Sequence, residues 1–182
     1  GRRSGRCGSA GAERAAAAQA RALGFEIREG GAETFSTDPE MFDCVTMSHV
    51  LEHFHRPLEA LEVALRLLRP GGQLYIDTPN VDSLGLERYG ASWRGLEPPR
   101  HLVLFNWRSL QELLVSTGYR RLVARPQPQI ATNIWMKSQR MEDGFSPYDE
   151  SAKLPASFWT ELPEGGRIPP DGTEFVTLTA KK

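Results

Sequence analysis

Little in this chain indicates a membrane, secreted or nucleic-acid-binding protein. Its 182 residues include only two cysteines, Cys7 and Cys44, whose wide separation predicts a reducing compartment and no disulfide framework. No apolar stretch approaches the ~20 residues that a membrane-spanning helix needs, and no signal peptide is visible. The net charge of -1 gives no electrostatic reason to expect nucleic acid or an anionic membrane as a partner. A cytoplasmic location is therefore expected.

The composition fits one globular domain with a short tail. Residues 1–12 are rich in Arg and Gly, which predicts a disordered tail. Residues 13–182 are expected to form the domain, since a chain of this length can bury an adequate core. Residues 125–173 are rich in Pro, Gly and polar side chains and predict a loop-rich, lid-like insertion, with a flexible surface loop as the alternative.

The centre of the chain predicts a strand, a helix and a second strand. Residues 43–47 form a short apolar and β-branched run that is typical of a covered strand. Pro57 can open a helix, and leucines then recur at helical spacing, at positions 58, 61, 65 and 68. The sequence Pro70-Gly71-Gly72 is expected to stop that helix before residues 74–76 resume an extended pattern. A unit of this length closes a parallel, right-handed crossover.

Polar residues gather where these two strands are expected to end. They lie in Ser48 to His53 and in Thr78 to Asn80. Parallel strands of such sheets place their binding groups at their carboxyl ends, where the loops converge. The two segments should therefore share one crevice.

Local signals predict the remaining elements. A helix from Ala15 to Leu23 ends at Gly24, and Asn106 can cap a helix from Trp107 to Thr117 that Gly118 ends. The other expected strands are Phe25–Arg28, Leu122–Ala124 and Phe175–Ala180. The last two should form an antiparallel closing hairpin.

Four motifs, taken in order and spacing, resemble one known family. They are Phe42-Asp43-Cys44-Val45, Ser48-His49-Val50-Leu51-Glu52-His53, Leu68-Arg69-Pro70-Gly71-Gly72 and Thr78-Pro79-Asn80. Together they resemble the class I S-adenosylmethionine-dependent methyltransferases, a large doubly wound α/β family. The stretch from Trp93 to Phe105 is similar to the segment after the fifth strand in one branch of these enzymes. The resemblance covers roughly Ala15 to Ala124 and, more loosely, Glu174 to Ala180.

The resemblance implies a fold and an activity. The fold is a Rossmann-like, mostly parallel α/β sheet with flanking helices and an antiparallel C-terminal hairpin. The activity is methyl transfer from S-adenosylmethionine to a small-molecule acceptor by in-line displacement. The sequence identifies neither the acceptor, be it an oxygen, nitrogen or carbon nucleophile, nor the oligomeric state.

One family feature has no counterpart here. The family wraps its cofactor in a glycine-rich loop after the first strand, whereas the glycine-rich residues 5–11 follow no apolar run that could form that strand. The chain is therefore expected to be truncated at the N-terminus and to lack the first two family strands. The alternative function is a non-catalytic methyltransferase-like fragment, or interaction module, with an incomplete cofactor site.

The resemblance also implies cofactor-binding residues. They are Glu13, Gly31, Ala32, Glu33, Ser48, His49 and Val50. Glu13 is the candidate for the acid that binds the ribose hydroxyls. The family often has an acid facing the adenine at the position that Gly31 occupies here, and Glu33, two residues later, is its candidate substitute. The alternatives are a helix N-terminal acid for Glu13 and a solvated loop acid for Glu33.

The resemblance further implies that the loop after the fifth family strand, which contains Trp93, Glu97, Arg100 and His101, supplies the substrate side of the site. His101 is the candidate general base, because histidine titrates near neutral pH. Arg100 could bind an acidic substrate group by a two-point contact, and Trp93 is a further candidate substrate contact. The alternative is that His101 and Arg100 tie this loop to the sheet by hydrogen bonds.

The pattern His49-x-x-Glu52-His53 also matches the signature of inverted zinc proteases. That site needs both histidines on one helical face, with the glutamate activating a metal-bound water. Here the pattern straddles a strand end and a loop, and Pro57 opens a helix only a few residues later. We therefore expect no metal, and Glu52 and His53 have the alternative role of orienting the loop.

Overall fold

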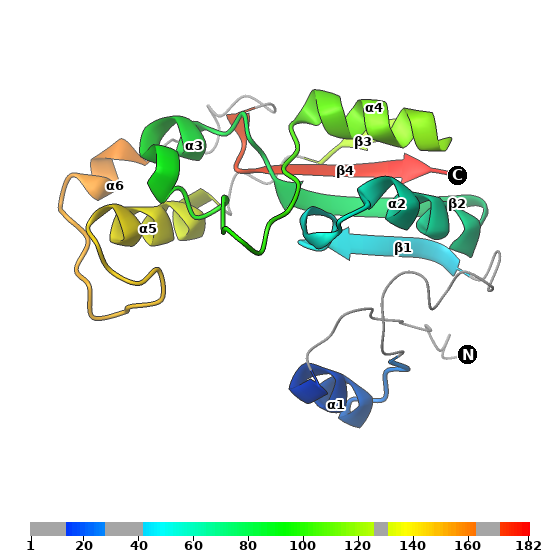
Figure 1. The fold of residues 1–182 in the computed structure, drawn as a ribbon, viewed down its shortest axis with the longest axis horizontal. Helices are drawn as coiled ribbons and strands as arrows, with labels where there is room; N and C mark the ends of the chain where they lie inside the picture. The colour runs from blue at the N-terminus through cyan, green and yellow to red at the C-terminus, as the bar shows by residue number, and fades with distance from the viewer. Residues whose placement is uncertain (1–13, 28–41, 126–130, 163–171) are drawn as a thin grey trace.

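The computed structural model describes residues 14–27, 42–125, 131–162 and 172–182 (Figure 1). In chain order the elements are α1 Arg14–Ala22, β1 Phe42–Ser48, the 3-10 helix η2 Leu51–His53, α2 Pro57–Leu67, β2 Leu68–Pro79, α3 Leu84–Tyr89, the 3-10 helix η3 Gly90–Ser92, α4 Trp107–Thr117, β3 Arg120–Ala124, α5 Ala131–Glu142, α6 Phe158–Glu161 and β4 Phe175–Lys181. Within these ranges, no helix has the length and apolar character to cross a membrane.

A four-stranded mixed sheet forms the centre of the molecule, in the order β1-β2-β4-β3. β1 and β2 are parallel, and β4 is antiparallel to both β2 and β3. The parallel β1–β2 pair and the antiparallel pair at the C-terminus confirm the predicted crossover and closing hairpin. Among the strands described, only β1–β2 is a parallel pair, so this part of the sheet is less parallel than the sequence predicts.

Helices α2 and α4 pack against each other, and local signals in the sequence mark the start of both and the end of α4. Pro57 occupies the first turn of α2, where its missing N–H costs no hydrogen bond. The Asn106 side chain accepts a hydrogen bond from the Ser109 N–H, and the Ser109 hydroxyl oxygen accepts one from the Asn106 N–H, which makes a capping box at the start of α4. Gly118 ends α4 with a φ of 109°, a left-handed conformation that glycine adopts most readily.

The main core lies between the sheet and these two helices. Its buried members are Met47, Leu51, Leu61, Ala64, Leu68, Leu74, Ile76, Phe105, Leu110, Leu114, Tyr119, Val176, Leu178 and Ala180. The Tyr119 hydroxyl donates a 3.1 Å hydrogen bond to the Leu61 carbonyl, so this buried polar group is satisfied. Leu58, predicted to share the apolar face of α2, is instead 42% exposed.

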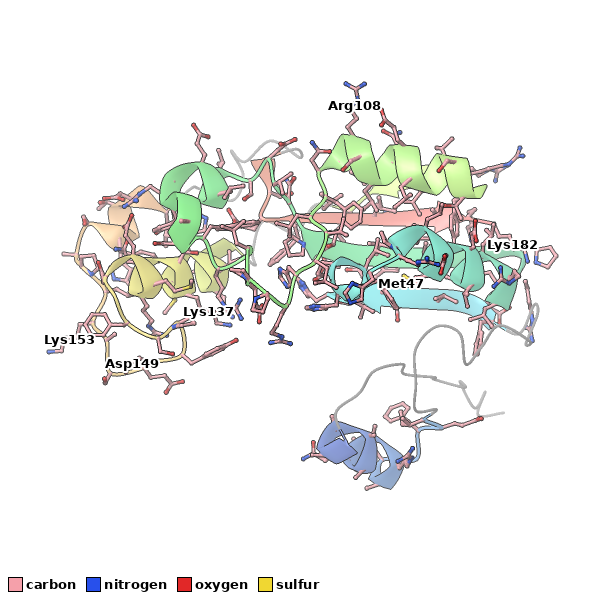
Figure 2. All side chains as sticks on the ribbon, viewed as in Figure 1. Met47, Arg108, Lys137, Asp149, Lys153 and Lys182 are labelled. Atoms are coloured by element: carbon pink, nitrogen blue, oxygen red, sulfur yellow. The ribbon has the colours of Figure 1, made fainter. Side chains whose placement is uncertain are left out.

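A second cluster of helices, α3, η3, α5 and α6, lies beyond the end of β1, and we call it the cap (Figure 1). Its own core consists of Tyr89, Trp93, Ile134, Trp135, Phe158 and Phe175. Figure 2 labels Lys137 on α5 and Met47 on β1, which mark the cap and the sheet. The sequence predicts neither α3 nor α5, and α5 lies inside the stretch that was expected to be rich in loops.

The structure corrects three details of the sequence analysis. Phe25, Glu26 and Ile27 form no strand, contrary to the expected strand at Phe25–Arg28. Cys44 is exposed, whereas the sequence predicts a covered strand over residues 43–47. β2 begins at Leu68, directly after α2, so the Pro70-Gly71-Gly72 sequence lies within the strand instead of before it.

Candidate active site

The carboxyl ends of β1 and β2 meet at one edge of the sheet, as the sequence predicts. Ser48 pairs with Asp77 in the parallel register, and the next N–H, that of His49, donates a 2.8 Å hydrogen bond to the Asp77 carbonyl. His49 then turns out of the strand with a φ of 51°, a left-handed conformation that is uncommon for a residue with a side chain. Its Nε2 atom lies 3.4 Å from Asp77 Oδ2. The turn thus places an imidazole directly beside a carboxylate.

Glu52 contacts residues at both strand ends, His49 after β1 and Thr78 in β2. Its side chain is 0% exposed, and Oε2 accepts a 3.0 Å hydrogen bond from the Thr78 hydroxyl. His49 Nδ1 lies 3.5 Å from the other oxygen, Oε1, which accepts no hydrogen bond from the described residues. A buried carboxylate with one oxygen left without a donor is unusual and points to a functional role.

Burial and pairing shift the pKa values of this cluster. The pKa of His49 is raised, mainly because Glu52 pairs with it, and Asp77 adds to this while burial opposes it. Burial is the largest influence on Glu52 and would raise its pKa, but the nearby His49 imidazole, its own backbone N–H dipole and the hydrogen bond from the Thr78 hydroxyl hold the pKa below the ordinary value. The pKa of Asp77 is raised by burial, although the Thr177 hydroxyl donates a 2.6 Å hydrogen bond to it. The cluster therefore favours an imidazolium beside an ionised Glu52.

The loop between η3 and α4 closes over Glu52. The Leu102 and Val103 N–H groups donate hydrogen bonds of 2.8 and 3.2 Å to the Glu52 carbonyl. His53 Nδ1 lies 2.8 Å from the Arg100 carbonyl, so the loop is held to η2 at several points. The loop backbone is therefore fixed beside the strand ends, where the sequence predicts a substrate loop.

Comparison with known proteins identifies the family. A family model described as a methyltransferase domain matches residues 7–123, more than half of the chain. The chain belongs to the methyltransferase domain family. The resemblance predicted from the sequence motifs is thereby confirmed.

Two curated relatives of this methyltransferase domain match over short stretches. An uncharacterised 37.1 kDa protein in a transposon of Streptomyces fradiae is 37% identical over 62 residues, which is 34% of this chain and 18% of that protein. A ubiquinone biosynthesis O-methyltransferase of Pseudomonas fluorescens is 38% identical over 59 residues, which is 32% of this chain and 25% of that protein. The matches thus span a quarter or less of the relatives' own length.

Solved structures share the fold across most of the chain. A SAM-dependent methyltransferase of Thermotoga maritima, described as a possible histamine N-methyltransferase, has a TM-score of 0.61 and 19% identity, and the match covers 96% of this chain and 72% of that one. A SAM-dependent methyltransferase of Archaeoglobus fulgidus has a TM-score of 0.60 and 17% identity, and the match covers 96% of this chain and 75% of that one. At such identities these likenesses show the fold.

The methyltransferase domain places the predicted cofactor residues in three different settings. Ser48 is exposed, and the His49 side chain is 43% exposed, so both face outward at the strand ends. Val50 is partly buried against the main core. Glu13, Gly31, Ala32 and Glu33 lie outside the described residues.

His101 is held inside the loop instead of facing outward. Its side chain is 6% exposed, and Nδ1 lies 2.7 Å from the Gly95 carbonyl. Its Nε2 atom lies 3.5 Å from Glu97 Oε2 and 4.0 Å from Glu52 Oε1. This setting favours the alternative in which His101 ties the loop together, because a general base must reach its substrate.

The two other predicted substrate contacts differ sharply from each other. Arg100 is 68% exposed and forms a 2.7 Å ion pair with Glu97, so its guanidinium can reach a ligand. Trp93 is fully buried, and its Nε1 donates a 2.7 Å hydrogen bond to Glu174. The prediction of Trp93 as a substrate contact is therefore corrected, since the indole packs inside the cap and is sealed from solvent.

The contacts described above form a strand-end cluster of His49, Glu52, Asp77, Thr78 and Thr177. Asp77 and Thr177 are the two members that the sequence motifs did not predict. Asp77 follows the apolar residues 74–76 directly, so an acid at the carboxyl end of a predicted strand was a signal that could have been used. Thr177 carries no such signal. It reaches Asp77 through the antiparallel pairing of β2 with β4, across a separation of 100 residues.

Proposed function

We propose that this methyltransferase domain binds S-adenosylmethionine at the carboxyl ends of β1 and β2 and methylates a small-molecule acceptor. The observation that carries the proposal is the position of His49, half-exposed at the open edge of the sheet between Asp77 and Glu52. The family supports it, because the chain matches a methyltransferase domain over residues 7–123. Several relatives are named ubiquinone biosynthesis O-methyltransferases, which supports a small organic acceptor.

The outward-facing residues at the strand ends fit such a cofactor. When bound, S-adenosylmethionine supplies a methyl group on a positively charged sulfur, which an acceptor attacks in line. Much of the rate can then come from holding the two reactants in contact, which rigid strand ends do well.

His49 is also the histidine of this site that can reach an acceptor. Its side chain is 43% exposed, whereas that of His101 is 6% exposed. We therefore assign His49, in place of His101, the contact with the reactants, and give His101 the role of holding the loop. Arg100 is the candidate contact for an acidic group of the acceptor, because its guanidinium is exposed beside the same loop.

Calorimetric titration with S-adenosylhomocysteine tests the proposal without knowledge of the acceptor. Saturable 1:1 binding in the micromolar to millimolar range is expected, as is usual for enzyme ligands. His49→Ala should weaken binding by about 10-fold, the loss expected for one interaction of about 1.4 kcal/mol. His55→Ala is the matched control, because His55 is exposed and lies outside the strand-end cluster.

A flat titration with a folded protein would contradict the proposal. It would favour the alternative of a non-catalytic methyltransferase-like module, for which the absent glycine-rich loop after a strand is the supporting observation. Circular dichroism of the same sample separates this outcome from an unfolded chain.

A further inference from the structure

Two histidines beside Glu52 are held in the same tautomer. His53 Nδ1 lies 2.8 Å from the Arg100 carbonyl, and His101 Nδ1 lies 2.7 Å from the Gly95 carbonyl. A carbonyl oxygen can only accept, so Nδ1 must carry the proton in both rings. In the neutral form of each ring, the lone pair is therefore on Nε2. Histidines that bind metals are commonly oriented this way, with the other ring nitrogen donating to a backbone carbonyl.

The third member of this group is the buried carboxylate. Glu52 Oε1 is 0% exposed with the rest of its side chain and accepts no hydrogen bond within the described part of the chain. His101 Nε2 lies 4.0 Å from this oxygen, and the rings of His53 and His101 lie with their centroids 4.9 Å apart. One ligand atom from each of Glu52, His53 and His101 lies within 4.8 Å of those of the other two.

We propose that Glu52, His53 and His101 form a binding site for a divalent transition-metal ion, with zinc as the representative ion. Two imidazole nitrogens and one carboxylate oxygen are ligands that zinc takes in proteins, at about 2.0–2.2 Å. Tetrahedral ligands at those distances lie about 3.4 Å apart, so the three atoms must draw together by roughly 1 Å. His53 is only partly buried, which leaves its ring room to rotate toward the other two.

This site differs from the zinc-protease pattern in the sequence. That pattern would use His49 and His53 as ligands and Glu52 as the base. Here Glu52 is itself a ligand, and the second histidine comes from the loop that begins after η3. Glu97 Oε2 lies 3.5 Å from His101 Nε2, but this oxygen is already paired with the Arg94 guanidinium, so a water molecule is the expected fourth ligand. A bound ion would link η2 to this loop and fix the loop against the strand ends.

Zinc titration of protein stripped with a chelator tests the site directly. Calorimetry should show one equivalent bound at micromolar affinity or better. His53→Ala and Glu52→Gln should each weaken binding by at least ~100-fold, since even the outer-shell partners of metal ligands contribute ~10–100-fold. Glu52→Gln keeps an oxygen for the Thr78 hydroxyl and nearly the same volume, so it guards against a loss caused by misfolding.

His55→Ala and Glu59→Gln are the matched controls, because both side chains are exposed near the site without belonging to it. Both should bind zinc like the parent. The spectrum of the cobalt(II) form should show nitrogen and oxygen ligands without thiolate bands. Thiolate bands would assign the ion to Cys7 or Cys44 and overturn the proposal.

Two other results would also overturn it. One is the absence of stoichiometric zinc uptake by folded parent protein. The other is parent-like zinc affinity in both His53→Ala and Glu52→Gln. No cofactor is present in this titration, so its failure leaves the methyltransferase proposal standing, and a flat S-adenosylhomocysteine titration leaves the metal site standing.

Discussion

Among the residues that the structure describes, one glutamate is buried at the strand ends and one in the cap, and their hydrogen bonding differs greatly. In the cap, Glu174 accepts three N–H hydrogen bonds, from Trp93 Nε1 at 2.7 Å, Trp135 Nε1 at 2.8 Å and the Gly85 backbone at 2.8 Å. At the strand ends, Glu52 accepts one hydrogen bond from a hydroxyl, and its Oε1 accepts none from the part of the chain that the structure describes. The same residue type therefore has its acceptors filled in one region and available in the other.

This difference separates a structural carboxylate from one that is free to act. Both oxygens of Glu174 are occupied, and its three donors come from a loop and two helices that it joins to the start of β4. Glu52 has histidines as neighbours and keeps an oxygen for a proton, a cation or a metal ion. Burial alone thus says little about function, because the number and type of donors decide it.

The largest expected change in the free energy of unfolding comes from replacing each of the two buried glutamates with alanine. Glu174→Ala should lower the free energy of unfolding by about 4 kcal/mol, because two indole N–H groups and one backbone N–H lose their acceptor in the interior. Glu52→Ala should cost less, about 2 kcal/mol, because only one hydroxyl is left without its partner. Urea unfolding followed by circular dichroism measures both.

Glu150→Ala provides the baseline, because Glu150 is exposed on the same side of the molecule as the cap, in the segment between α5 and α6. It should stay within about 0.5 kcal/mol of the parent. The comparison fails if Glu52→Ala is as damaging as Glu174→Ala, since both oxygens of Glu52 would then be carrying structural interactions.

A smaller effect is expected from removing the single donor to Glu52. Thr78→Val keeps the side-chain shape and leaves Glu52 Oε2 buried without its hydrogen bond, which should cost about 1–2 kcal/mol. Thr46→Val, at an exposed position on neighbouring β1, should be nearly neutral. Equal midpoints of urea unfolding for the two variants would show that the Thr78 hydrogen bond contributes nothing measurable.

Much of the sheet and its helices follows from signals that are local in the sequence. Asn106 and Gly118 mark the ends of α4, and the predicted bounds match the structure. Pro57 marks the start of α2. The cap could not be predicted in the same way, because its organising residue, Glu174, meets Trp93 across 81 residues and no short-range pattern reports that contact.

In the candidate site, too, local features could be predicted from the sequence, whereas contacts between distant residues could not. The meeting of His49 with the end of β2 follows from the rule that parallel strands gather polar residues at their carboxyl ends. The burial of Trp93 and His101 could not be inferred, because whether a loop side chain points outward depends on what packs over it. The contact of Thr177 with Asp77 could not be predicted either, because it depends on the register of β2 against β4, which the whole sheet sets.

The smallest predicted effect is a pH dependence of the cap. Burial raises the pKa of Glu174 above its ordinary value, and the N–H groups of Trp135, Trp93 and Gly85 oppose that rise. A carboxyl with a raised pKa holds its proton more tightly in the folded state than in the unfolded state. Its contribution to stability is therefore greatest below its ordinary pKa of 4.5 and is lost as the pH rises through the raised value.

Glu174→Gln cannot titrate, so the unfolding free energy of the parent minus that of this variant should fall as the pH rises above about 4.5. Urea unfolding at a series of pH values measures that difference and cancels the other titrating groups. A difference that rises with pH would mean that the three N–H donors outweigh burial and hold Glu174 ionised. The cap would then be held by a charged acceptor, so Glu174 and Glu52 would be alike in charge. They would differ only in the Oε1 atom of Glu52, which has no donor among the described residues.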